Sequence, residues 1–211
     1  MERIWLKNYP PGVPHDIDTT QYKSLTDLLE RAFHEHGNNP FSVCMNRWMS
    51  YKQLDELSTA LGAWLQSKGL EPGSRVAIML PNLPQFAVTM AAILRAGYTC
   101  VNVNPLYTAR ELEHQLKDSG ATAIVILENF AATLQDVIER TAVQHVALAS
   151  IGDLLGPING RWLSFAVRHL AKMVPPFELP LTNGRKVVSF KKALALGERR
   201  TLAPSTATLD S

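Results

Sequence analysis

Polar side chains follow two apolar runs of the sequence and could line a binding cleft. Pro81-Asn82 closes the run RVAIML, and Asn102-Val103-Asn104-Pro105 closes the run TCVNV, with Tyr107 shortly after it. Ligands of open parallel sheets bind outside the carboxyl ends of the strands. Asn82, Asn104 and Tyr107 are therefore candidate cleft residues, although asparagine and proline also terminate strands without any further role.

A second stretch with chemical potential is the segment Arg161–Met173, which has helical length and composition. At 3.6 residues per turn its basic side chains fall within about 60° of arc, and apolar side chains cover most of the rest. A basic, tryptophan-bearing amphipathic helix can lie at a membrane surface. The alternative is a helix packed on the sheet with its long basic side chains in water. The candidate membrane-contact residues are Arg161, Trp162, Phe165, Arg168 and Lys172.

The motifs of the common catalytic and nucleotide sites are absent from this sequence. It has no GxxxxGK[ST] loop, no GxGxxG after a strand, no GxSxG elbow and no Cys-x-x-Cys pair. His34 and His36 are two residues apart on a predicted helix, so they do not share a face and zinc ligation there is disfavoured. His114 lies among charged residues of a solvated helix face. The sequence therefore predicts no catalytic, cofactor-binding or metal-ligating residue.

Composition places the chain among globular proteins. Its 211 residues are 46% hydrophobic and 19% charged, enough apolar material for a core. The net charge of +2, from 21 basic and 19 acidic residues, argues against a nucleic-acid binder. Cys44 and Cys100 lie in apolar runs, which predicts buried reduced thiols and fits a cytoplasmic setting. No apolar run approaches the ~20 residues of a membrane span, and we expect no signal peptide.

The spacing of apolar runs predicts an α/β fold built on a parallel sheet with βαβ crossovers. RVAIML, PQFAVTMAAILRAG and TCVNV read as strand, helix and strand, and their crossover should be right-handed. Thr108 begins another helix with Glu111 three residues later, and Asn129 is expected to cap FAATLQDVIER. Four strands begin near residues 75, 99, 122 and 144, a step that suits strand, helix and two short loops.

The flanking segments divide the chain into regions 1–49, 50–150, 151–200 and 201–211. Ser24 should cap a helix to His36, a hairpin should turn at Asn46, and Ser50 with Gln53 should form a capping box. Residues 1–20, rich in proline and aromatics, predict an extended arm on the domain surface or one that reaches a second subunit. After residue 150 the regular alternation of strands and helices ends. VVSFKKALALG reads as a strand edge followed by a helix capped by Ser189. The last region reads as a linker.

Several longer stretches resemble the AMP-forming adenylating enzymes, and in particular bacterial long-chain fatty-acid–CoA ligases. MSYKQL resembles the family's first conserved block and LRAGYTCVNVNP its second. VNVNPLYT followed by RELEHQLKDSGA is typical of the fatty-acyl branch, as are IWLKNYPPGVP, RTAVQHVAL and MVPPFELP. The resemblance covers effectively the whole chain and implies the N-terminal portion of the adenylate-forming fold.

The resemblance also implies an activity for the intact enzyme. A fatty-acid carboxylate attacks the α-phosphate of Mg²⁺-bound ATP, and coenzyme A (CoA) then displaces AMP. The family's phosphate loop, TGGTTGxxKG, is expected a few residues beyond Ser211, and the family's magnesium-holding acid and C-terminal lysine further on. We therefore expect the chain to be inactive alone. The alternative is a non-catalytic membrane-surface or dimerisation module. Under either reading we expect the protein to be cytoplasmic or peripheral at the inner face of the cell membrane.

Overall fold

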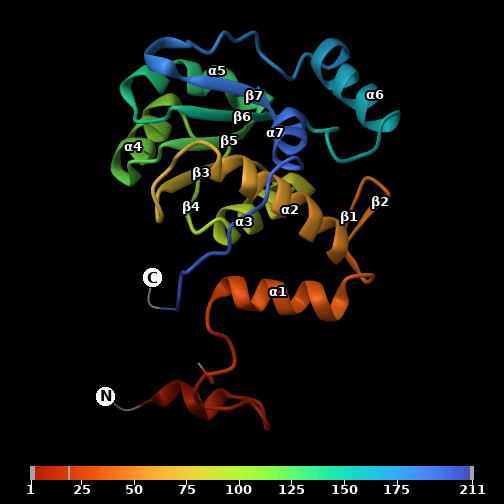
Figure 1. The fold of residues 1–211 in the computed structure, drawn as a ribbon, viewed down its shortest axis with the longest axis vertical. Helices are drawn as coiled ribbons and strands as arrows, with labels where there is room; N and C mark the ends of the chain where they lie inside the picture. Colours follow the sequence, from red (N-terminus) through yellow and green to blue (C-terminus); the bar gives the residue numbers. More distant parts are fainter. Residues whose placement is uncertain (1–2, 19, 210–211) are drawn as a thin grey trace.

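A five-stranded parallel sheet forms the centre of the computed structural model, which describes residues 3–18 and 20–209 (Figure 1). The strand order is β4-β3-β5-β6-β7, and each neighbouring pair is parallel. The strands are β3 (Arg75–Met79), β4 (Thr99–Asn102), β5 (Ala123–Leu127), β6 (His145–Ala149) and β7 (Lys186–Ser189). The α/β prediction and its four strand starts are confirmed. The expected sheet was one strand short, because VVS pairs in parallel with β6 after a long excursion.

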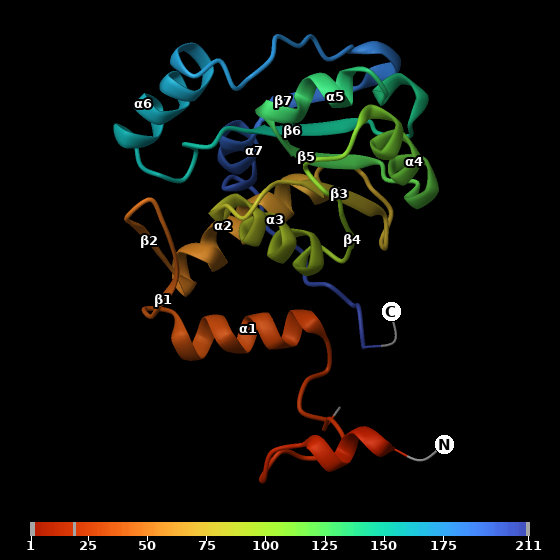
Figure 2. The same cartoon turned by 180° about the vertical axis from the view of Figure 1, so that it is seen from behind.

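Helices cover both faces of this sheet, so its central strands are buried on both sides (Figures 1 and 2). One face carries α2, α3 and α7, which pack around Trp64, Ile93 and Phe190. The other face carries α4 and α5, with Leu112 and Leu134 in the core. The helices are α1 (Leu25–His36), α2 (Tyr51–Gln66), α3 (Pro84–Arg95), α4 (Ala109–Ser119), α5 (Ala131–Gln135), α6 (Asn159–Phe165) and α7 (Phe190–Gly197).

Local sequence signals account for the helix starts and the hairpin. The Ser24 hydroxyl accepts a hydrogen bond from the Asp27 backbone N–H at 3.0 Å. Ser50 with Gln53, and Thr108 with Glu111, form complete capping boxes. The strands β1 (Pro40–Cys44) and β2 (Arg47–Ser50) pair antiparallel across a two-residue turn. Both turn residues, Met45 and Asn46, have positive φ, as a type I′ hairpin turn requires. These predictions are confirmed.

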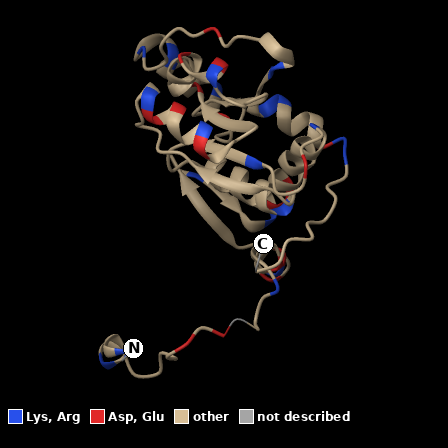
Figure 3. Cartoon of the chain, turned by 90° about the vertical axis from the view of Figure 1, so that its left-hand side faces the viewer, with Lys and Arg blue, Asp and Glu red and all other residues tan. Residues whose placement is uncertain are grey.

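The N-terminal arm departs from the expected placement. Its residues 3–18 include a 3-10 helix at Ile4–Asn8 and project away from the domain instead of lying on its surface (Figure 3). Trp5 is 49% exposed and Tyr9 is 40% exposed, so neither aromatic finds a burial site on this chain. The alternative, that the arm reaches a second subunit, stays a prediction.

The excursion between β6 and β7 also differs from its prediction. The helix α6 continues as a π-helical turn, Ala166–Leu170, and ends before Met173. Lys172 lies beyond it with a φ of 51°. The single basic arc expected for Arg161–Met173 is therefore wrong, because a π turn changes the angular spacing of the side chains.

Asn129 does not cap a long helix. It lies inside a 3-10 turn, Glu128–Phe130, which is followed by the short α5 and a second 3-10 turn. The Asn129 side-chain amide instead donates to the backbone carbonyl of Met173 at 2.9 Å. The capping prediction was wrong because this amide makes a contact with a segment distant in sequence.

The described part of the last region runs back over α2. The side-chain amide of Gln66 both donates to the Ala203 carbonyl, at 3.0 Å, and accepts from the Ala203 N–H, at 2.9 Å. Ser211, beyond which the resemblance places the phosphate loop, lies outside the described residues. Both cysteines are free and only partly buried, and burial raises the pKa of Cys100 to about 11. Within residues 3–18 and 20–209, no helix is long and apolar enough to cross a membrane.

Candidate functional site at the carboxyl edge of the sheet

Asn82 lies at the carboxyl edge of the sheet, three residues after β3. It is exposed and borders a shallow hollow of about 270 Å³ between the hairpin and the start of α3. Phe41, Val43 and Phe86 line the same hollow, so its walls are largely apolar. Neither Asn104 nor Tyr107 belongs to it.

Asn104 and Tyr107 belong to one turn that follows β4. The Asn104 side-chain oxygen accepts from the Leu106 N–H at 3.0 Å, and its backbone carbonyl accepts from the Tyr107 N–H at 3.1 Å. Tyr107 is partly buried against the core on the α4 face. Asn104 thus shapes the turn that leads into the cap at Thr108. A cleft role for Asn82, Asn104 and Tyr107 stays a prediction.

A polar network occupies the same edge where β5 and β6 end, and we name it the carboxyl-edge cluster. Two of its members are carboxylates that are almost fully buried: the Glu128 side chain is 5% exposed and that of Asp153 is 9% exposed. Arg168, from the π turn of the excursion, forms an ion pair with Glu128. Lys191, from α7, places its Nζ 3.6 Å from Asp153 Oδ1. The cluster consists of Gln85, Glu128, Ser150, Asp153, Arg168 and Lys191.

The backbone of Ser150 connects one of the two carboxylates, Asp153, to α3. The Ser150 N–H donates to Asp153 Oδ2 at 2.7 Å, and Gln85 Nε2 donates to the Ser150 carbonyl at 2.9 Å. Burial raises the pKa of Asp153, opposed by the Ser150 N–H and by Lys191, and the charge of Glu128 raises it further. Because each carboxylate already has a basic partner, the cluster positions the excursion and α7 over the sheet edge.

The sequence reasoning missed this cluster. Glu128 and Arg168 are 40 residues apart, and Gln85 and Ser150 are 65 apart, so no local spacing connects them. One signal was available: Glu128 follows directly after the fully apolar run AIVIL, at a strand end where a lone acid needs a partner.

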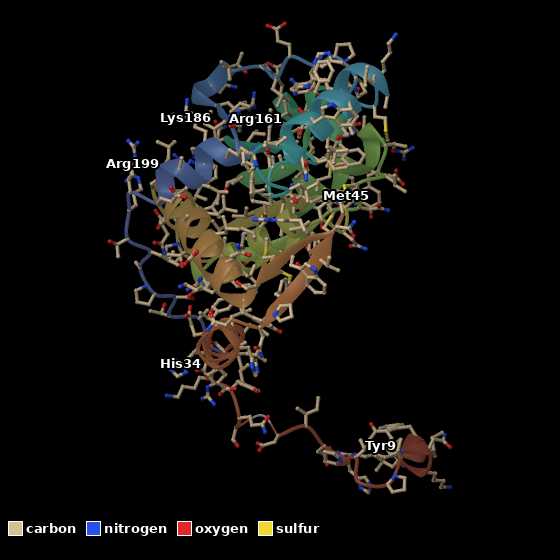
Figure 4. The ribbon with its side chains drawn as sticks, turned by 90° about the vertical axis from the view of Figure 1, so that its right-hand side faces the viewer. Tyr9, His34, Met45, Arg161, Lys186 and Arg199 are labelled. Carbon is tan, nitrogen blue, oxygen red and sulfur yellow. The ribbon has the colours of Figure 1, made fainter. Side chains whose placement is uncertain are left out.

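The five candidate membrane-contact residues do not lie on one helical face, and their contact with a membrane stays a prediction. Trp162 and Phe165 are 65% and 54% exposed. Arg161 is exposed, and Figure 4 shows it at the opposite end of the molecule from Tyr9 of the arm. The charge of Arg168 is compensated by Glu128, and Lys172 lies past the end of the helix.

The ligands that the resemblance implies can be compared with these side chains. In the described part of the chain, no three or more His, Cys, Asp or Glu side chains lie close enough together to hold a metal ion. The two buried carboxylates of the carboxyl-edge cluster are already paired with Arg168 and Lys191. These residues do not fit Mg²⁺, and none of them is assigned to it.

This sequence is similar to known proteins over most of its length. The model of the AMP-binding enzyme family matches residues 29–187. The long-chain-fatty-acid–CoA ligase of Escherichia coli O157:H7 is 46% identical over 94% of this chain, and that of Haemophilus influenzae is 43% identical over 95%. The chain spans about 35% of the length of each.

The fold of this chain also resembles parts of solved enzyme structures. A long-chain-fatty-acid-CoA ligase from Archaeoglobus fulgidus superposes with a TM-score of 0.62 over 93% of this chain and 34% of its own, at 22% identity. The likeness to this structure concerns the fold, and the family match covers most of the sequence. The chain belongs to the AMP-binding enzyme family.

Proposed function

We propose that this chain forms the N-terminal scaffold of a long-chain fatty-acid–CoA ligase. The intact enzyme would convert a fatty acid, ATP and CoA to acyl-CoA, AMP and pyrophosphate. The observation that carries the proposal is the 46% identity to the Escherichia coli O157:H7 ligase, which extends over 94% of this chain. Solved structures that share the fold but are less than 25% identical to this chain do not support any assignment of its substrate class.

In that reaction the fatty-acid carboxylate attacks the α-phosphorus of ATP, and the bond to pyrophosphate breaks. The CoA thiolate then attacks the acyl carbon, and AMP leaves. Mg²⁺ supplies charge neutralisation on the polyphosphate when it is bound. The part assigned to this chain is a rigid sheet whose carboxyl edge supports the site, because such edges are where open parallel sheets bind ligands. Its buried acids are paired, so we assign no proton transfer to them.

Pyrophosphate release tests the proposal. The assay supplies palmitate, ATP, Mg²⁺ and CoA to the 211-residue chain and to a chimera in which this chain replaces the matching segment of the Escherichia coli O157:H7 relative. We expect no release from the chain alone and palmitate-dependent release from the chimera. Release by the chain alone would refute the scaffold role. A folded chimera without activity would refute the assignment to this ligase class.

A second candidate function is peripheral contact with the cytoplasmic face of a membrane. It is favoured by apolar side chains that α6 and the residues after it leave in water: Trp162, Phe165, Leu170 and Met173 are each more than half exposed. Arg161 lies among them on α6, and no ion pair with a described residue compensates its charge. Such a surface suits insertion at the headgroup level of anionic lipids.

Co-sedimentation with anionic vesicles tests this contact. We expect Trp162→Ala to weaken binding, since it removes the largest exposed side chain of α6. Trp5→Ala, which removes a comparably exposed tryptophan from the arm, is the matched control and should bind like the unmodified chain. Equal binding of all three chains would contradict a role for α6.

A further inference from the structure

Basic side chains gather at the amino edge of the sheet, opposite the carboxyl-edge cluster. His145 is the first residue of β6 and Lys186 the first of β7, and the two are register partners in the parallel ladder. Neighbouring strands lie about 4.8 Å apart, so the two side chains start side by side.

Both of these side chains point to the face that α2 and α7 cover. Side chains alternate along a strand, and Ala147, two residues after His145, belongs to the core on that face. Val188, two residues after Lys186, packs against the same core. His145 and Lys186 therefore project toward the ends of the helices that cover this face.

A further basic residue lies shortly after the end of each of two of those helices. Lys68 follows the end of α2 by two residues, and Arg200 follows the end of α7 by three. Burial lowers the pKa of Lys68, and the charges of Lys186 and Arg200 lower it further. Burial likewise lowers the pKa of His145, with added effects of Lys68 and Lys186. We name His145, Lys186, Lys68 and Arg200 the amino-edge cluster.

The basic side chains of the amino-edge cluster are not paired with acids in the part of the chain described here, although Arg200 lines the same hollow as Asp27 and Glu30. None of the ion pairs between described residues includes Lys68, Lys186 or Arg200. The three like charges of Lys68, Lys186 and Arg200 raise the energy of the fold unless an anion joins them.

Two unpaired ring nitrogens accompany these charges. The Lys68 ammonium lies 4.9 Å from the centre of the Trp64 ring, whose side chain is 2% exposed. Neither Trp64 Nε1 nor His145 Nδ1, both shielded from solvent, has a hydrogen-bond partner among the described residues. The indole nitrogen can only donate, and the imidazole can donate from either nitrogen. An acceptor-rich ligand would serve the ammonium groups and the guanidinium alike.

We propose that the amino-edge cluster is a binding site for a phosphate-type anion, held by Lys68, Lys186 and Arg200 around His145. Lysine acts on phosphate as a point charge, and arginine offers a planar fork that matches two oxygens. The site is remote from the carboxyl edge of the sheet, so the proposal does not depend on the ligase function.

Thermal unfolding of the full chain in phosphate and in chloride, at equal ionic strength, tests the site. We expect phosphate to raise the Tm along a saturating curve, as a ligand specific for the folded state does. Lys186→Gln should weaken the apparent affinity about tenfold, the equivalent of one charge-assisted hydrogen bond. Lys192→Gln, an exposed lysine of α7 outside the cluster, is the matched control and should keep the full response. In chloride, Lys186→Gln should be at least as stable as the unmodified chain, since it relieves repulsion.

The side-chain N–H resonance of Trp64 gives a second readout that does not depend on stability. It should shift on titration with inorganic phosphate or pyrophosphate, and the shift should shrink in Lys186→Gln. Equal stabilisation of all three chains by phosphate would be a general salt effect and would overturn the site. Binding of AMP without binding of inorganic phosphate or pyrophosphate would also overturn it, because recognition would then depend on the nucleoside.

Discussion

The clearest test of the fold's energetics is the buried guanidinium of Arg95, which joins three helices. Arg95 lies at the end of α3 and is 7% exposed. Its Nε is 2.8 Å from Glu30 on α1, its Nη2 is 2.8 Å from Asp55 on α2, and its Nη1 donates to the Ser58 hydroxyl at 2.7 Å. The guanidinium also lies over the Phe33 ring of α1. Arg95→Ala removes all of these contacts at once.

The expected cost follows from what the truncation leaves behind. Removing one partner of a buried ion pair typically costs about 3–5 kcal/mol, because the other charge remains desolvated. Glu30 and Asp55 keep 50% and 39% of their side-chain exposure, so water can recover part of their solvation. The expected loss is therefore near the lower end, about 3 kcal/mol. Arg31→Ala, which removes an exposed pair with Asp27 within α1, should cost less than about 1 kcal/mol.

Urea unfolding measures both variants, with the free energy taken from the midpoint and slope. Arg95→Lys adds a check, since it keeps the charge but lacks the fork that reaches three partners, and its loss should fall between the two alanine variants. If Arg95→Ala unfolded within about 0.5 kcal/mol of Arg31→Ala, the view that this guanidinium holds α1 and α2 against α3 would be refuted.

The remaining predictions concern a glycine at a close helix contact, the pH dependence of stability and the N-terminal arm. Gly197→Ala should destabilise the fold by about 1–3 kcal/mol in urea unfolding, because its new Cβ would lie 1.8 Å from the Ala60 carbonyl oxygen. The control is Gly37→Ala, whose new Cβ would lie 3.1 Å from its nearest atom, and it should cost less. The pKa of His145 is lowered, so the unfolded chain binds the proton more readily. Stability should fall as the pH drops below about 6.5, and His145→Gln should flatten that dependence in urea midpoints measured across pH. If the arm joins two subunits, deletion of residues 1–14 should lower the sedimentation coefficient from dimer to monomer, and an unchanged association state would contradict the arm's role.

Short-range signals in the sequence predicted much of this fold correctly. The caps at Ser50 and Thr108 depend on residues three positions apart, and the hairpin at Asn46 depends on two turn residues, so the local sequence contains what each feature needs. The strand starts could be predicted because an apolar run between turn residues is typical of a strand in a sheet that is covered on both faces.

Long-range contacts could not be predicted in the same way. Parallel pairing of β7 with β6 crosses a 36-residue excursion that lacks the regular alternation of strands and helices seen earlier in the chain. The Glu128–Arg168 pair and the Asn129–Met173 bond both anchor that excursion, and both join residues 40 or more positions apart. The arc expected for Arg161–Met173 assumed α-helical geometry throughout, which the π turn at Ala166–Leu170 does not have.

Acyl-CoA formation by the chimera is the most direct test of the central claim, that this chain can serve as the N-terminal scaffold of a fatty-acid–CoA ligase. The measurement is the mass-spectrometric yield of palmitoyl-CoA from palmitate, ATP, Mg²⁺ and CoA. The comparison is between the chimera, this chain alone and the remainder of the Escherichia coli O157:H7 relative alone. We expect palmitoyl-CoA from the chimera and from neither part. Product from the remainder alone, or none from a chimera that unfolds cooperatively, would contradict it.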